Sequence, residues 1–122
     1  MHEDQFPLVL ENETQTATLA GTKCWLQEKL PVLKARLAHS GALLLRGFPV
    51  RTDQEFDQIV QSFDYREFTY EESLSNAVRV NRTPRVFTAN EAPPSEGIFL
   101  HNELAQTPIF PTRLFFFCEQ AA

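Results

Sequence analysis

The chain has 122 residues, of which 43% are hydrophobic and 22% are charged, a balance typical of a folded globular domain and not of a disordered segment. The formal net charge is -5, with 16 acidic and 11 basic residues, and no run of Lys or Arg occurs, which argues against binding to nucleic acid. The sequence has neither an apolar run of about 18 residues nor a basic amino-terminal signal, so it predicts no membrane span and a cytoplasmic protein.

The first forty residues predict a short strand followed by a long helix. Residues 6–10 are apolar enough to form the strand. From Thr22 to Leu37, leucines recur at helical spacing, with Thr22 as the expected N-cap and Gly41 as the stop. Pro31 lies inside this pattern, so we expect the helix to bend there or a second helix to start.

A buried strand and a second helix are expected next. Residues 42–46 form a short apolar run that indicates a buried strand. A capping box follows, in which the Thr52 hydroxyl accepts from the amide of Glu55 and the Glu55 carboxylate returns to the cap. The helix after it is amphipathic. Its apolar stripe consists of Phe56, Ile59, Val60 and Phe63. Its polar side consists of Asp53, Glu55, Asp57, Gln58 and Gln61.

A long polar stretch follows at residues 64–84, which predicts a loop. Arg79 and Arg82 lie in this loop and Arg85 comes directly after it. The three guanidinium groups could bind an anionic group, because a guanidinium matches a carboxylate or a phosphate. A solvated basic stretch explains them equally well. Beyond the loop we expect a strand at 85–88.

The two cysteines, Cys24 and Cys118, are far apart in sequence and have apolar neighbours. They form no CxxC pair, which argues against a zinc site, and we expect two buried thiols. A disulfide would require their Cα atoms to approach within about 7 Å, and nothing in the sequence indicates this. Cys118 ends the apolar run 114–118, which predicts a strand buried on both faces.

The residues that most need a chemical explanation are His101 and Glu103, in the apolar run from Ile98 to Leu104. In an extended strand, side chains two positions apart lie on the same face, so an imidazole and a carboxylate would project together while Asn102 points to the other face. These are two of the three ligands of a facial triad that binds non-heme Fe(II). An ordinary His and Glu pair on a partly exposed strand is the alternative.

The segment around this motif resembles the taurine dioxygenase (TauD/TfdA) family. The resemblance is carried by residues 86–119, VFTANEAPPSEGIFLHNELAQTPIFPTRLFFFCE, and extends upstream to residues 41–48. Within the family, the H-N-E form is most similar to the syringomycin-type hydroxylases associated with peptide natural products. The implied fold is α+β, mainly β: a partial double-stranded β-helix (jelly roll, clavaminate synthase-like) with two N-terminal helices, incomplete at the C-terminus.

The resemblance also implies a chemistry. Fe(II) would be held by His101, Glu103 and a later His, leaving positions for the cosubstrate 2-oxoglutarate and for dioxygen. The expected reaction is hydroxylation of a small molecule, because relatives that halogenate lack the carboxylate. Glu in place of the commoner Asp favours an amino acid over taurine as the substrate, either free or bound to a carrier protein. Candidate substrate contacts are Asn102, Arg79 and Arg82.

The family is longer than this chain, so the resemblance implies that residues 1–122 are the N-terminal portion of a single dioxygenase domain, inactive as a fragment. The distal His ligand and the Arg that binds 2-oxoglutarate are expected downstream. His39 fits a stabilising role at a helix C-terminus and His2 lies at the terminus, so neither is preferred as a ligand. A non-catalytic metal-binding domain and an interaction module remain as alternatives.

Overall fold

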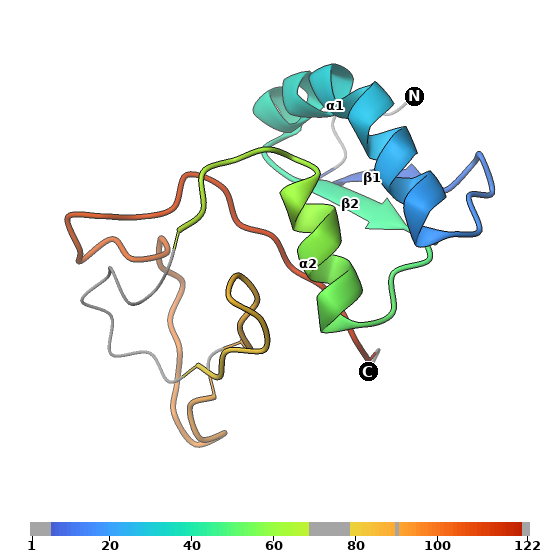
Figure 1. The fold of residues 1–122 in the computed structure, drawn as a ribbon. Coiled ribbons are helices and arrows are strands. Elements are labelled where there is room, and N and C mark those ends of the chain that lie inside the picture. Colours follow the sequence, from blue (N-terminus) through green and yellow to red (C-terminus); the bar gives the residue numbers. More distant parts are fainter. Residues whose placement is uncertain (1–5, 69–78, 90, 121–122) are drawn as a thin grey trace. The chain divides into compact units, whose positions relative to one another are not determined.

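The computed structural model describes residues 6–68, 79–89 and 91–120 (Figure 1). The chain divides into two compact units, Met1–Asp64 and Tyr65–Ala122. The helices and strands of the described residues all belong to the first unit. In chain order they are β1 (Leu8–Glu11), α1 (Leu19–Ser40), β2 (Leu43–Arg46) and α2 (Asp53–Gln61).

The two strands form a parallel pair. Leu8 pairs with Leu43 and Glu11 with Arg46, and α1 is the crossover that a parallel connection requires. Both expected strands are therefore confirmed, with small shifts of their ends. The expectation that β2 is buried on both faces is wrong: its side chains alternate, and Leu44 is 37% exposed. The reason is the pleat, which turns successive residues to opposite faces of the sheet.

Helix α1 begins one turn earlier than the sequence indicated. The N-cap is Thr18, whose hydroxyl accepts from the Gly21 amide at 3.1 Å. Thr22, the expected cap, lies within the helix, only 2% exposed, and its hydroxyl donates to the Thr18 carbonyl at 3.0 Å. A buried hydroxyl can be accommodated in a helix in this way, because the free carbonyl electron pairs of the preceding turn accept its proton.

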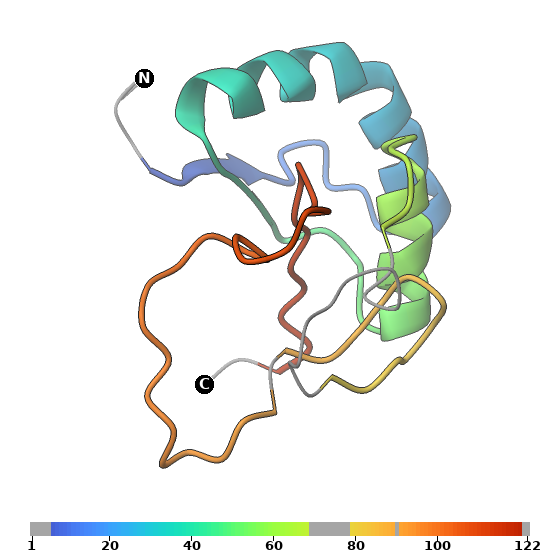
Figure 2. The same ribbon diagram turned by 90° about the vertical axis from the view of Figure 1, so that its left-hand side faces the viewer.

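The end of α1 and its proline follow the expectation. Gly41 is the C-cap with φ 77°, and its amide donates to the Leu37 carbonyl at 2.9 Å. Pro31 lies inside the single helix, which bends near its middle (Figure 2). A proline in a helix interior removes one hydrogen bond and crowds the preceding turn, so it is a sufficient cause for the bend.

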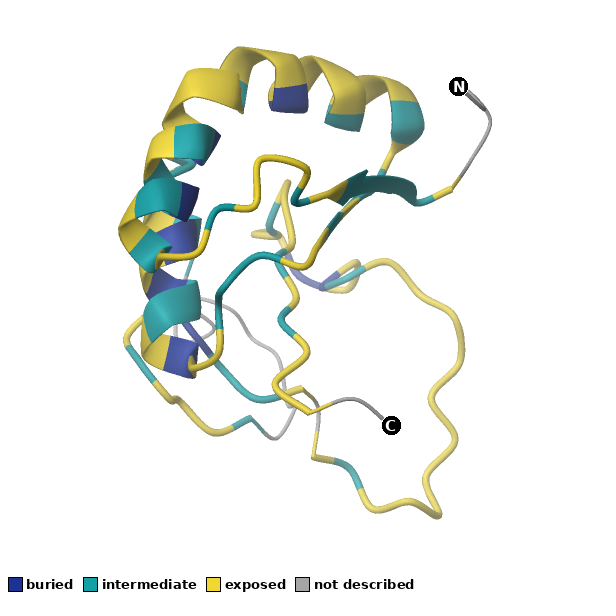
Figure 3. Cartoon of the chain, turned by 90° about the vertical axis from the view of Figure 1, so that its right-hand side faces the viewer, coloured by how far each residue is buried: buried dark blue, intermediate teal, exposed yellow. Residues whose placement is uncertain are grey.

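The core of the first unit lies between the helices and the strand pair. Leu26 and Leu33 of α1 and Ile59 of α2 are buried, with exposed fractions of 0%, 3% and 7% (dark blue in Figure 3). Partly buried apolar residues pack against them: Leu10, Leu19, Trp25, Leu43, Leu45, Val50 and Phe63. This cluster fixes the strands against the helices.

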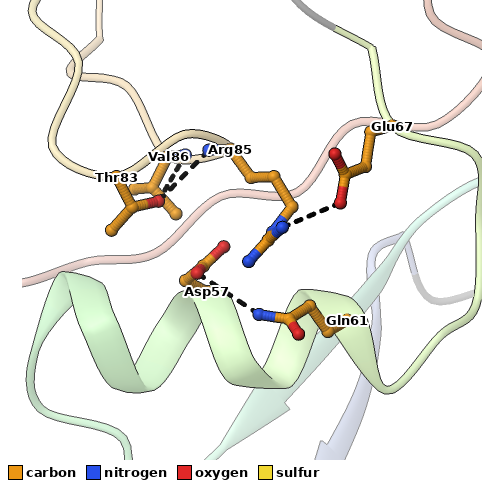
Figure 4. A network of polar contacts seen from close by, with 6 residues as sticks. All are labelled: Asp57, Gln61, Glu67, Thr83, Arg85 and Val86. Atoms are coloured by element: carbon orange, nitrogen blue, oxygen red, sulfur yellow. Dashed lines mark hydrogen bonds and ion pairs between the residues drawn. The ribbon is translucent and has the colours of Figure 1, made fainter.

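Helix α2 has the expected cap with one difference. The Thr52 hydroxyl accepts from the Glu55 amide at 3.2 Å, as predicted, but the Glu55 carboxylate accepts from the amide of Arg51 at 2.7 Å and not from the cap residue. The expected polar side is partly wrong, because Asp53 and Asp57 are both buried. Asp57 accepts from the Gln61 side chain at 3.3 Å (Figure 4), and such bonds let a polar group leave water.

The described part of the second unit is mostly irregular. The strand expected at 85–88 is reduced to one antiparallel bridge between Asn81 and Phe87. The segment 114–118 is not a strand and is not buried on both faces, since Phe116 is 86% exposed. A strand exists only when a neighbour completes its hydrogen bonds, and no described residue pairs with this segment.

Both cysteines are exposed, so the expectation of buried thiols is wrong. Cys24 lies on the outer side of α1, where its thiol is 3.7 Å from a Glu28 carboxylate oxygen one turn later. Among the described residues, no helix combines the length and the apolar character needed to cross a bilayer.

Candidate metal centre

His101 and Glu103 lie at the entry to a tight turn and not in the expected strand. The turn is closed by a hydrogen bond of 3.2 Å from the Ala105 amide to the Asn102 carbonyl. The two central residues of the turn are Glu103 and Leu104, and Leu104 has φ 55°. This left-handed conformation ends any extended segment at Leu104. The expectation of a strand here is wrong, because no described residue pairs with this segment.

Leu104 anchors this turn in the second unit. Its side chain is 3% exposed, and its carbonyl accepts from the amide and the hydroxyl of Thr107, each at 3.0 Å. The Thr107 hydroxyl also lies 2.5 Å from the Ile109 carbonyl. A left-handed leucine carries strain of about 1–3 kcal/mol, and strained residues of this kind concentrate at functional sites. The turn is thus held by buried contacts directly beside the two candidate ligands.

The imidazole of His101 is oriented by the backbone. Its Nδ1 lies 2.6 Å from the Phe99 carbonyl oxygen. Because a carbonyl can only accept, Nδ1 carries the proton, and the lone pair of the neutral ring is on Nε2. Histidines that bind metals usually donate their other ring N–H to a carbonyl or carboxylate, so this arrangement fits a ligand.

The carboxylate of Glu103 is held by an arginine. Glu103 Oε1 lies 3.3 Å from Arg79 Nη2, and the two side chains are 21% and 19% exposed. Arg79 Nη1 also lies 3.4 Å from the Thr88 carbonyl. The structure therefore brings together Glu103 and Arg79, two residues that the sequence nominated for different roles. An ionised carboxylate accepts several hydrogen bonds, so this contact does not exhaust Glu103.

A short hairpin positions Arg79. The Thr88 amide donates to the Val80 carbonyl at 3.0 Å, and the Val80 amide donates to the Thr88 hydroxyl at 3.0 Å. At the tip, the Thr83 hydroxyl accepts from the Val86 amide at 3.0 Å (Figure 4), and the Arg82 amide donates to the Val86 carbonyl at 2.8 Å. The two bonds between Val80 and Thr88 fix the base of the hairpin, next to Arg79.

The other two arginines form ion pairs with other carboxylates. Arg82 Nη2 lies 3.7 Å from Glu119 Oε1, with 43% and 58% of the side chains exposed. Arg85 Nη1 lies 2.8 Å from Glu67 Oε1 (Figure 4). Each arginine thus contacts a different carboxylate. Asn102 is exposed, and its backbone carbonyl closes the turn described above.

The donor set fits two positions of an iron site. An imidazole and a carboxylate are two of the three donor types of a facial triad, whose third donor is a second imidazole, and His101 and Glu103 carry these two groups. Within residues 6–68, 79–89 and 91–120, no group of three or more His, Cys, Asp or Glu side chains could hold a metal ion.

Comparison with known proteins assigns the chain to a family of dioxygenases. The family described as "Taurine catabolism dioxygenase TauD, TfdA family" matches residues 5–122. The chain belongs to this family of oxidoreductases, whose fold is a jelly roll. The family expected from the H-N-E motif is confirmed.

Two curated relatives agree with this assignment. The chain is 45% identical over 87 residues to a clavaminate synthase-like protein of Arabidopsis thaliana, which covers 71% of this chain and 26% of the relative. It is 36% identical over 86 residues to the dapdiamide synthesis protein DdaC of Enterobacter agglomerans, which covers 70% of this chain and 26% of the relative. The chain thus spans about a quarter of the length of these relatives.

Proposed function

We propose that the whole protein is an Fe(II)- and 2-oxoglutarate-dependent dioxygenase that hydroxylates an amino acid, either free or bound to a carrier protein. Residues 1–122 contribute part of a single dioxygenase domain, built on a double-stranded β-helix. The observation that carries the proposal is the oriented imidazole of His101 two residues before a carboxylate, in a chain that belongs to a dioxygenase family. Family membership also disfavours a non-catalytic domain.

In this proposal the motif residues have separate roles. His101 binds iron through Nε2 while its Nδ1–H stays on the Phe99 carbonyl, which fixes the plane of the ring. Glu103 binds through its carboxylate, and a second imidazole elsewhere in the whole protein completes the triad. When bound, Fe(II) with 2-oxoglutarate supplies the activation of dioxygen.

The substrate class is inferred from the motif and from one relative. The Glu of the H-N-E motif is longer than the Asp of the taurine enzymes, which favours a different small molecule. One relative is named for dapdiamide synthesis, and this supports a substrate from biosynthesis, presented as an amino acid or on a carrier protein. We assign Asn102 and Arg82 as candidate substrate contacts, because both are exposed polar residues of the second unit.

The ligand roles can be tested with the full-length protein. Fe(II) and 2-oxoglutarate are added without oxygen, and the weak visible metal-to-ligand charge-transfer band is recorded. We expect the band in the wild type and in His39→Ala, a control in the last turn of α1, and its loss in His101→Ala. No band in the wild type, or an unchanged band in His101→Ala, would contradict the proposal.

The substrate class needs a second measurement. With oxygen admitted, succinate formation is compared in the presence of free amino acids, the same amino acids loaded on a carrier protein, and taurine. We expect an amino acid in one of its two forms to accelerate succinate formation more than taurine does. A clear preference for taurine would refute the substrate class while leaving the iron site intact.

A further inference from the structure

We infer that Arg79 is a positioning residue for Glu103, and not a substrate contact. This inference depends on the proposed function, because it concerns how the carboxylate of a metal ligand is oriented. It starts from the 3.3 Å contact between Arg79 Nη2 and Glu103 Oε1, which joins residues 24 positions apart in the sequence.

The burial of this ion pair separates it from ordinary surface pairs. Its two side chains are 19% and 21% exposed, whereas those of Arg46 and Glu11 are 61% and 54% exposed. Exposed pairs are screened by water and salt, and they fix geometry poorly. A pair that is largely withdrawn from water is screened much less, so Arg79 can hold the carboxylate in one orientation.

The guanidinium is itself held at a second point. Arg79 Nη1 lies 3.4 Å from the carbonyl of Thr88, and Thr88 is tied to Val80 by two hydrogen bonds at the base of the hairpin. Because the guanidinium is planar and rigid, two contacts on different nitrogens fix its plane. The hairpin therefore restrains the guanidinium of Arg79, and the guanidinium in turn restrains the Glu103 carboxylate.

Glu103 needs such a partner because its own backbone lies outside any strand. It is the first central residue of the turn from Asn102 to Ala105, so no sheet holds it in register. Its side chain has several rotatable bonds, and an unrestrained carboxylate would lose conformational freedom on binding a metal. Arg79 removes part of that freedom in advance, while the positive charge it brings opposes the cation. We infer that the gain in metal affinity from orienting the carboxylate exceeds the loss from the repulsion between Arg79 and the cation.

Metal affinity tests the inference directly. Co(II), as a stand-in for Fe(II), is titrated calorimetrically into the full-length protein and into Arg79→Ala, Arg79→Lys and the matched control Arg46→Ala. Loss of a group that orients a ligand typically weakens metal binding about 10- to 100-fold. We expect a loss of this size in Arg79→Ala with unchanged stoichiometry, a loss in Arg79→Lys, which cannot reproduce the planar fork, and no loss in Arg46→Ala.

A second readout separates orientation from general damage to the fold. The visible spectrum of bound Co(II) depends on ligand geometry, so we expect it to change in Arg79→Lys and to match the wild type in Arg46→Ala. Arg79→Lys keeps the charge and the aliphatic stem, so it serves as the test if Arg79→Ala does not fold.

The outcomes distinguish this inference from the proposed function. If the wild type binds Co(II), Glu103→Ala does not, and both folded Arg79 variants bind as tightly as the wild type or more tightly, the positioning role is wrong and the ligand role of Glu103 remains. If the wild type does not bind Co(II), both proposals are overturned.

Discussion

The imidazole Nδ1 of His101 lies 2.6 Å from the carbonyl oxygen of Phe99, two residues earlier in the chain. This contact predicts the tautomer of the metal-free protein. In the neutral imidazole we expect nitrogen NMR to show His101 with its proton on Nδ1. His39, which is exposed on α1, is the control and is expected to favour the Nε2–H tautomer. A proton on Nε2 of His101 would contradict the arrangement.

The cap of α2 predicts a loss of stability on removal of one hydroxyl. Thr52→Ala removes the acceptor of the Glu55 amide, and N-cap substitutions of this kind lower the free energy of unfolding by about 0.5–2 kcal/mol. Gln54→Ala, at an exposed position of the same helix, is the control and is expected to change stability little. Urea unfolding followed by circular dichroism measures both. Equal midpoints for the two variants would show that the cap contributes nothing.

The core of the first unit predicts a larger effect. Leu26 is 0% exposed, so Leu26→Ala leaves a cavity, which lowers the free energy of unfolding by about 2–5 kcal/mol. Val32 on the same helix is 50% exposed, and Val32→Ala is expected to cost much less. Thermal unfolding of the two variants gives the comparison. A similar loss for both would mean that Leu26 is not part of a packed core.

The end of α1 predicts a purely conformational effect at Gly41. Its φ is 77°, and an added Cβ would meet only Phe6 at 3.7 Å, an ordinary contact. Gly41→Ala should therefore lower stability by about 1–2 kcal/mol, because of backbone strain and not because of a clash. Gly97→Ala is the control, since an added Cβ would have no described residue within 4 Å and the φ of Gly97 lies outside the left-handed region. A neutral Gly41→Ala in urea unfolding would refute this explanation.

The sequence predicted those features that depend on neighbouring residues. The Thr52 cap and the Gly41 stop are each defined by contacts within four positions, so the local pattern was sufficient. The apolar run of β2 was also found, although its pairing with β1 is a long-range contact. The H-N-E motif was specific enough to predict the family, because it occurs together with the surrounding Pro-rich and aromatic residues.

The predictions from sequence were wrong or incomplete where burial, a long-range contact or an unusual backbone conformation determines the structure. Asp57 is polar and was expected on the solvent side of α2, but it is buried, and the polarity of a residue does not show whether the folded chain covers it. No spacing rule joins Arg79 to Glu103. The left-handed conformation of Leu104 is rare for a residue with a branched side chain, so alternation alone predicted a strand where the structure has a turn.

The parallel pairing of β1 with β2 has a consequence for synthesis on the ribosome. Asn12 and Gly47, just beyond the two strands, are 35 positions apart, and a chain made at about 5–20 residues per second takes roughly two to seven seconds to cover that interval. Throughout it, β1 waits without its partner. We expect added protease to cut within β1 in nascent chains arrested with β1 outside the exit tunnel and β2 still inside it, and chains with both strands outside the tunnel to resist.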